Sequence, residues 1–257
     1  MGTVTVMDTL TEREIRMWWI RQRRISLGKN GFFRGFYDCH SHLLPGVDDG
    51  LQQMEQSLEL LAELEEAGVA CLWLTPHVAE DMPNTTAALE ERFGLLKERY
   101  RGRMALRLAA EYMLDAGFSE RLEKRDLLTL GQRRVLVETS FAGAPYNFWS
   151  LLDQIKEAGY SPVLAHPERY LYMGKEEYDK LKKNNIALQL NLPSLAGYYG
   201  KAVCQRAGLL LKEGYYQHVG CDIHSRSYWN RLSATELSRK MAAEVAALVR
   251  NNKEKLI

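Results

Sequence analysis

The chain has 257 residues, of which 46% are hydrophobic, enough to bury one large core. Its 34 basic and 33 acidic residues give a net charge of +1, so the composition offers no case for a nucleic-acid partner. No apolar run approaches the roughly 20 residues that span a bilayer, and the N-terminus lacks the apolar core of a signal peptide, so the expected location is the cytoplasm.

Residues 1–35 form a basic N-terminal extension. They carry seven basic residues and three acidic ones, a local net charge of 7 − 3 = +4, around the pair Trp18-Trp19. The charge run is short and interrupted, which favours a helix packed on the outside of the folded domain with solvated arginines. The alternative is a basic amphipathic helix that touches a partner or the inner face of the membrane.

Short apolar runs alternate with helix-like segments from residue 36 onward. The expected strands are 36–40, 70–75, 105–110, 134–138, 162–166, 186–191 and 217–222. Helices are expected at 54–67, which Gly68 would end, at 151–158, at 201–213 and at 233–249. Runs such as Val135-Leu136-Val137 are apolar at every position, which is typical of parallel strands covered on both faces.

Seven alternations in about 220 residues predict a closed or nearly closed α/β barrel, for which roughly 250 residues is typical. A doubly wound open sheet is the main alternative. The barrel accounts better for the polar residues described next, because candidate ligands end six of the seven strands, and barrel active sites form where the strand C-termini meet.

Five of the six histidines lie where an apolar run gives way to a loop. They are His40, His42, His77, His166 and His224. His40 and His42 are one residue apart, so in an extended strand their side chains point to the same side and can bind one metal. Histidine is the commonest metal-binding side chain. The sixth, His218, has no acidic neighbour and falls at a strand start, so we expect it to pack in the core.

Carboxylate side chains also lie where apolar runs give way to loops. Glu111 and Glu138 each end an apolar run, where a carboxylate is costly to bury unless it is paired or bound to a cation. Asp222 precedes His224 with the spacing of the His40–His42 pair. Each glutamate alone could pair with an arginine, but together with the histidines they indicate a polynuclear metal site. Asp49 stands before a glycine, and its local sequence alone would make it a turn residue.

Covalent catalysis by cysteine is excluded by spacing. Cysteine phosphatases need an arginine six residues after the nucleophile. The residues six places after the four cysteines are Pro45, His77, Leu210 and Ser227. The cysteines also form no C-x-x-C pair and no zinc-finger spacing, so we expect free thiols in a reducing compartment.

The polar motifs together resemble the polymerase and histidinol phosphatase (PHP) superfamily, and more narrowly its bacterial capsular and exopolysaccharide tyrosine phosphatases. The resemblance covers residues 36–257 and leaves 1–35 outside. It rests on Asp-Cys-His-Ser-His-Leu-Leu-Pro-Gly-Val-Asp-Asp-Gly (38–50), Thr-Pro-His (75–77), Ala-Glu-Tyr (110–112), Leu-Val-Glu-Thr-Ser-Phe (136–141), Pro-Val-Leu-Ala-His-Pro-Glu-Arg-Tyr (162–170) and Asp-Ile-His (222–224).

The resemblance implies a distorted (β/α)7 TIM-like barrel and three divalent metal ions. Manganese is the metal usual in the family, and iron or zinc would also suit a mixed nitrogen and oxygen site. One metal is expected on His40, His42 and Asp222, with Glu111 bridging to a second that Glu138 and His166 complete, and a third on Asp49, His77 and His224.

The resemblance also implies catalytic roles and a substrate. Arg169 is expected to clamp the phosphate, with Glu111 and Asp49 as the other catalytic residues, and Arg226 is a weaker second candidate for the clamp. The expected substrate is a phosphotyrosine protein, namely the tail of a bacterial tyrosine kinase that controls polysaccharide export. A small-molecule phosphatase of the histidinol type and a non-catalytic scaffold remain as alternatives, whereas a nuclease would need a basic track.

Overall fold

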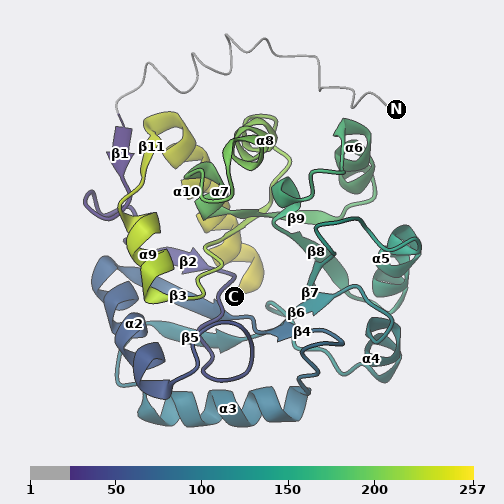
Figure 1. The fold of residues 1–257 in the computed structure, drawn as a ribbon, viewed down its shortest axis with the longest axis horizontal. Helices are drawn as coiled ribbons and strands as arrows, with labels where there is room; N and C mark the ends of the chain where they lie inside the picture. The colour runs from purple at the N-terminus through teal and green to yellow at the C-terminus, as the bar shows by residue number, and fades with distance from the viewer. Residues whose placement is uncertain (1–23) are drawn as a thin grey trace.

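Seven strand positions build a curled parallel sheet in the computed structural model, which describes residues 24–257 (Figure 1). They are β2 (Phe36–Asp38), β3 (Val69–Leu74) continued by β4 (His77–Val78), β5 (Ala105–Leu108) continued by β6 (Glu111–Met113), β7 (Arg134–Glu138), β8 (Ser161–Ala165), β9 (Ala187–Asn191) and β10 (His218–Gly220). Every neighbouring pair among them is parallel. The seven predicted strands are therefore confirmed, although two of them are broken.

The two breaks divide the sheet into a three-stranded part, β2-β3-β5, and a six-stranded part, β10-β9-β8-β7-β6-β4. The first break contains Pro76, which has no N–H to donate to a ladder. Backbone hydrogen bonds bridge the breaks, from Ala109 N to Leu74 O at 2.9 Å and from Glu111 N to Pro76 O at 3.0 Å. The sheet is therefore continuous across both parts.

The first and last strands meet and close the barrel. Ser41 and Ile223 form a parallel bridge just after β2 and β10. The adjacent hydrogen bonds run from Asp222 N to His40 O at 2.8 Å and from His42 N to Ile223 O at 2.9 Å. The expected distorted (β/α)7 TIM-like barrel is confirmed, and the open doubly wound alternative is wrong.

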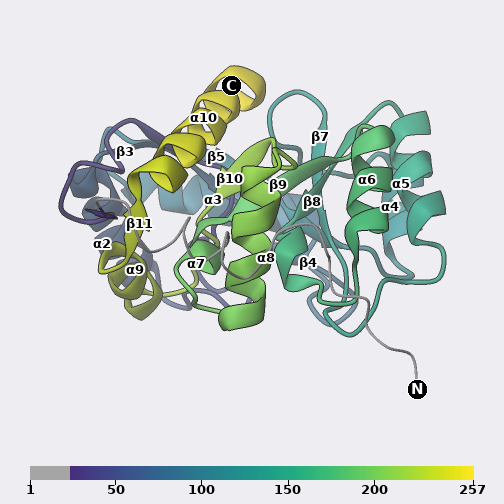
Figure 2. The ribbon, with the colours of Figure 1, turned by 90° about the horizontal axis from the view of Figure 1, so that it is seen from above.

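Helices cover the outside of this sheet (Figures 1 and 2). They are α2 (Met54–Ala67), α3 (Thr86–Arg99), α4 (Phe118–Lys124), α5 (Phe148–Glu157), α6 (Lys175–Lys183), α7 (Leu192–Leu195), α8 (Lys201–Lys212), α9 (Arg226–Ser233) and α10 (Arg239–Leu256), with a short 3₁₀ helix η1 (Pro167–Arg169). Gly68 ends α2 in the left-handed conformation, with φ of 102°, as predicted. No helix within residues 24–257 is long and apolar enough to cross a membrane.

One predicted helix, 233–249, is wrong at its start. The chain leaves α9 at Ser233 and forms a short strand, β11 (Glu236–Ser238), before α10 begins. The Ser238 hydroxyl caps α10 by accepting a hydrogen bond from Met241 N at 3.2 Å. β11 pairs antiparallel with β1 (Arg24–Ser26), a contact between the two ends of the chain that local sequence does not reveal.

Residues 24–35 pack against the barrel. Leu27 and Phe33 are each only 1% exposed, and the Phe33 ring lies 4.8 Å from that of Trp229. The helix expected around Trp18-Trp19 falls outside the described residues.

The core lies in two layers, because alternate residues of a strand face opposite sides of a sheet. On β7, Val135 and Val137 join the large cluster that includes the helices, whereas Leu136 joins a smaller cluster with Val163. Glu138, two residues after Leu136, ends the strand on that same side. The polar residues therefore gather where the strands end.

Candidate metal centre

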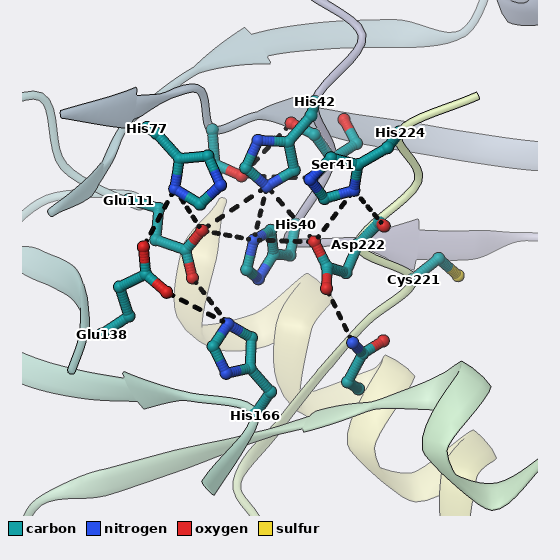
Figure 3. Close-up of polar contacts among 12 residues, drawn as sticks. His40, Ser41, His42, His77, Glu111, Glu138, His166, Cys221, Asp222 and His224 are labelled. Carbon is teal, nitrogen blue, oxygen red and sulfur yellow. Dashed lines mark hydrogen bonds and ion pairs between the residues drawn. The ribbon is translucent and has the colours of Figure 1, made fainter. Parts of the chain in front are cut away.

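The nine residues predicted to bind metal lie together at the C-terminal ends of the strands, and all of them except Asp49 are labelled in Figure 3. A cavity of about 310 Å³ is lined by seven of them, Asp49, His77, Glu111, Glu138, His166, Asp222 and His224, and also by Arg169. His40 and His42 are fully buried beside it. The ligands are spread over 185 positions of the sequence, from His40 to His224, and the barrel brings them together.

His40 and His42 turn bare ring nitrogens towards one point. His40 Nδ1 lies 2.8 Å from Gln189 Oε1, and His42 Nδ1 lies 2.7 Å from Asp48 Oδ2. Both partners are acceptors, which assigns the ring protons to Nδ1 and leaves lone pairs on both Nε2 atoms. Those Nε2 atoms face each other at 3.0 Å. Two lone pairs at this separation repel each other unless a proton or a cation lies between them.

Carboxylate oxygens complete this first group of ligands. Asp222 Oδ1 lies 3.5 Å from His40 Nε2 and 3.2 Å from His42 Nε2. Glu111 Oε2 lies 3.2 Å and 3.5 Å from the same two atoms. Two imidazole nitrogens and two carboxylate oxygens around one point are a donor set typical of a borderline divalent metal.

Glu111 connects this group to a second one. Its Oε2 also lies 3.2 Å from His77 Nδ1, while its Oε1 lies 2.9 Å from His166 Nε2. Glu138 contacts the same two histidines, at 3.0 Å from His77 Nδ1 and 3.8 Å from His166 Nε2. Glu111 Oε2 therefore lies between the two groups while Oε1 faces His166, so this one carboxylate contacts both groups of ligands.

The third group lies at the more open side of the cavity. Asp49 Oδ1 lies 3.3 Å from His224 Nε2 and 3.6 Å from His77 Nε2. The Asp49 side chain is 56% exposed, whereas those of His77 and His224 are 15% and 25% exposed. His77 faces the second group with Nδ1 and the third with Nε2, so the structure places it between two groups where the sequence assigned it to one.

The charges of the cluster balance only with added positive charge. Burial opposes the charged imidazole, yet Glu111 and Asp222 raise the pKa of His40 to about 9. Burial likewise opposes the charged carboxylate, but the histidines hold the pKa of Glu111 and of Asp222 well below its usual range. Buried carboxylates require a counter-charge. Divalent cations bound by the lone pairs of the histidine rings would supply it, so the donor set fits metal ions.

Arg169 is held beside the metal cluster on three sides. Its guanidinium lies between the rings of Phe141 and Tyr199, at 4.1 Å and 4.2 Å from the ring centroids. Its Nη1 lies 3.3 Å from Asp222 Oδ2. The guanidinium lines the cavity and contacts both rings, so the N–H groups that Asp222 does not bind are available to donate hydrogen bonds to a ligand.

Arg226, the weaker candidate for a phosphate clamp, lies elsewhere. Its Nη2 pairs with Glu59 at 2.9 Å and Glu63 at 2.8 Å on α2, and it does not line the cavity. That prediction is wrong, because two carboxylates outside the site hold the side chain.

Sequence reasoning missed the residues that orient the ligands. Asp48 orients His42, Gln189 orients His40, and Asn191 Nδ2 donates to Asp222 Oδ2 at 2.7 Å. A signal existed for two of them. Asp48 is a second aspartate directly before Asp49, and Gln189 is a polar residue within an otherwise apolar strand. Asp38, also buried, accepts hydrogen bonds from the backbone N–H groups of His40 and Cys221.

Comparison with known proteins gives a family and several relatives. The family described as capsular polysaccharide synthesis, CpsB/CapC, matches residues 36–257. The tyrosine-protein phosphatase CpsB of Streptococcus pneumoniae is 30% identical over 238 residues, which are 86% of this chain and 97% of the relative. The tyrosine-protein phosphatase YwqE of Bacillus subtilis is 27% identical over 231 residues, which are 86% of this chain and 91% of the relative.

Solved structures agree with these matches. One comes from the pair YwqE of Bacillus subtilis and CpsB of Streptococcus pneumoniae, described as unique metal-dependent tyrosine phosphatases. It superposes with a TM-score of 0.70 at 25% identity, covering 86% of this chain and 88% of the other. A phosphotriesterase homology protein from Escherichia coli has a TM-score of 0.54 at 14% identity, covering 87% of this chain and 99% of the other, which is a likeness of fold alone.

Proposed function

The chain belongs to the CpsB/CapC family of capsular polysaccharide synthesis, and we propose from this premise that it is a metal-dependent protein-tyrosine phosphatase. The observation that carries the proposal is the pair of bare Nε2 atoms of His40 and His42, 3.0 Å apart and flanked by Asp222 and Glu111. A scaffold that had lost its chemistry would have no need to keep this donor set in a buried site.

The metals we propose are three divalent ions, with manganese first and iron or zinc as alternatives. His40, His42 and Asp222 would hold one ion, and Glu111 would bridge to a second on Glu138 and His166. Asp49, His77 and His224 would hold the third. The clusters of ligand atoms around His40, His42 and Asp222 and around Asp49, His77 and His224 support two of these sites, whereas the cluster around Glu111 and Glu138 contains His77 in place of His166. When bound, such ions lower the pKa of coordinated water and neutralise charge on phosphoryl oxygens.

Residues of the chain would bind the phosphoryl group and hold the metal ligands in place. Arg169 would donate hydrogen bonds from its guanidinium to the phosphoryl oxygens, held in place by its contacts with the Phe141 and Tyr199 rings. Glu111 would hold two groups of ligands together through its carboxylate. Asp49, the most exposed ligand, would lie where a substrate enters the cavity. A tyrosyl leaving group has a reference pKa near 10, so it needs little acid assistance.

We propose a phosphotyrosine-bearing protein as substrate, specifically the tail of a bacterial tyrosine kinase that controls capsule or exopolysaccharide synthesis. Family membership and the names of the relatives support this substrate. A cytoplasmic setting is supported by the four cysteines, which are all free. The near-neutral net charge gives no support to a nucleic-acid substrate.

In the alternative interpretation of residues 1–35, their basic side chains would bring the enzyme to an anionic membrane surface. Because β1, Leu27 and Phe33 are part of the packed structure, the informative variant deletes residues 1–23 only. Binding of this variant to vesicles containing anionic lipid should be weaker than binding of the full chain. Equal binding would end the proposal of membrane contact and leave the phosphatase proposal untouched.

The function is tested by phosphate release from a phosphotyrosyl peptide, a phosphoseryl peptide and histidinol phosphate, each with manganese and with chelator. We expect manganese-dependent release with a preference for the phosphotyrosyl peptide. A preference for histidinol phosphate would replace the proposal with a small-molecule phosphatase. No release with any metal would favour the scaffold.

A further inference from the structure

Four aromatic side chains line the cavity of the metal centre, and one of them is unlike the others. They are Phe141, Tyr198, Tyr199 and Tyr228. Phe141 is 48% exposed and is the only exposed large hydrophobic residue, among residues 24–257, that lines this cavity. It offers water no hydrogen-bonding group, so the exposure of its ring is unfavourable until a ligand covers it.

The three tyrosines already have partners. The Tyr199 hydroxyl lies 3.4 Å from Asp222 Oδ2 and forms a hydrogen bond with the Tyr228 hydroxyl. The Tyr198 ring packs 4.4 Å from that of Tyr228, and its face is covered by Arg231 at 4.4 Å. Tyr228 is buried and Tyr198 and Tyr199 are half-buried, so Phe141 is the aromatic side chain of the cavity with the largest exposed surface for a ligand.

Phe141 lies beside Arg169 and beside the metal ligand His166, the two parts of the site that would bind a phosphate ester. One face of its ring covers the Arg169 guanidinium at 4.1 Å, and its centroid lies 5.8 Å from that of the His166 ring. The Tyr170 ring, also at 5.8 Å and fully buried, supports it from the protein side. A phosphoryl group bound between Arg169 and the metal ligands would therefore place its ester substituent near the Phe141 ring.

We propose that Phe141 is the aryl-binding surface of the site, a specificity-determining residue that favours aromatic over alkyl phosphate esters. The inference rests on the proposed phosphatase function and deepens it. A tyrosyl ester carries its rigid ring directly on the ester oxygen, where it can stack on Phe141. A seryl ester has only a methylene group there and cannot make this contact. Aromatic pairs of this kind contribute beyond the area they bury.

The test compares two inhibitors that differ only in the ring, phenylphosphonate and methylphosphonate, on the manganese-loaded full chain. Neither has an ester bond to hydrolyse, so their inhibition constants report binding without differences in leaving group. Phe141→Ala should reduce the preference for phenylphosphonate roughly tenfold, equal to about 1.4 kcal/mol. Phe141→Tyr should restore the preference, because it restores the ring.

Tyr146→Ala is the matched control. Tyr146 belongs to the same loop between β7 and α5, is 102% exposed and does not line the cavity, so its removal should leave the preference unchanged.

Two outcomes would overturn the inference. If Phe141→Ala weakens both phosphonates equally, Phe141 only positions Arg169. If Phe141→Ala weakens neither phosphonate, another surface binds the ring. Turnover of a phosphotyrosyl peptide by the unaltered chain is measured separately. If that turnover is absent, the proposed function fails. If it is present while the preference survives Phe141→Ala, only the role of Phe141 fails.

Discussion

Asp48 accepts a hydrogen bond from His42 Nδ1, and this contact decides which nitrogen of His42 faces the cluster. The histidine in turn lowers the pKa of Asp48 to about 2 against the opposing effect of burial, so Asp48 stays charged at any ordinary pH. Asp48 Oδ2 also accepts from His77 N at 3.2 Å. A single carboxylate thus orients one expected ligand and anchors the backbone of a second.

Replacing Asp48 by alanine should weaken metal binding by about 10- to 100-fold, which is typical when a partner that orients a ligand is lost. Asp48→Asn keeps an acceptor oxygen at the same place and should lose less. Competition titration with a chromophoric chelator measures both affinities. Unchanged affinity in Asp48→Ala would mean that packing alone fixes the His42 ring.

Arg169 should contribute to turnover and not to metal binding, because it touches Asp222 Oδ2 from the cavity side while the cluster faces Asp222 Oδ1. Arg169→Ala is expected to retain its metal and to lose about 100-fold or more in kcat, as for removal of other donors to developing negative charge. Arg226→Ala is the control, since Arg226 pairs with α2 and should be dispensable. Loss of metal from Arg169→Ala would show that Arg169 is a structural residue.

At the scale of elements, the helix α10 holds the seam between the first and last strands. Asn252 Nδ2 donates to Tyr37 O on β2 at 2.7 Å and to Val219 O on β10 at 2.6 Å. Its Oδ1 lies 3.0 Å from His218 Nδ1. The side chain of Asn252 therefore satisfies backbone groups where β2 and β10 do not pair directly. His218 packs at the start of β10, as expected.

This seam should be sensitive to acid. Burial lowers the pKa of His218 to about 4, below the model-peptide value of about 6.5 that applies to the unfolded chain. The unfolded chain therefore binds the proton first as pH falls, and stability present above pH 6.5 is lost towards pH 4. Between pH 7 and pH 5 the loss from this group should be about 2 kcal/mol. Urea unfolding of the wild type and of His218→Gln measures it, and equal pH dependence in both would contradict the prediction.

The strands were predictable from sequence because buried parallel strands are continuous apolar runs. The positions of the ligands other than Asp49 followed from where those runs end, whereas Asp49 came from the family resemblance alone. The pairing of β1 with β11 was not predictable, because it depends on contacts between segments that are distant in the sequence. For the same reason the sequence located the histidines and acids of the site but not Gln189 and Asn191, whose roles exist only through hydrogen bonds across the barrel.

At the scale of the whole molecule, the metal cluster lies across the closure of the barrel. His40 and His42 follow β2, the first strand of the barrel, and Asp222 follows β10, its last strand. These strands share only a short ladder around Ser41 and Ile223. A metal held by residues of both would therefore join the two ends of the sheet and bind the folded state alone.

Metal binding should consequently raise the melting temperature. At a free manganese concentration 1,000 times the Kd, a site of this kind adds about 4 kcal/mol to the free energy of unfolding. Calorimetry with manganese and then with excess chelator measures the shift and its reversal. A melting temperature that manganese does not change would show that these residues bind no metal in the folded protein.

Manganese content and phosphotyrosyl-peptide hydrolysis, measured together on the wild type and on Asp222→Asn, test most directly whether this cluster is the catalytic metal centre. Asparagine preserves the shape of the side chain and tolerates the left-handed backbone of this position, with φ of 53°, while it removes the charge. We predict that the variant folds, loses bound metal and loses manganese-dependent turnover. Full turnover by Asp222→Asn would contradict the assignment of this cluster as the catalytic metal centre.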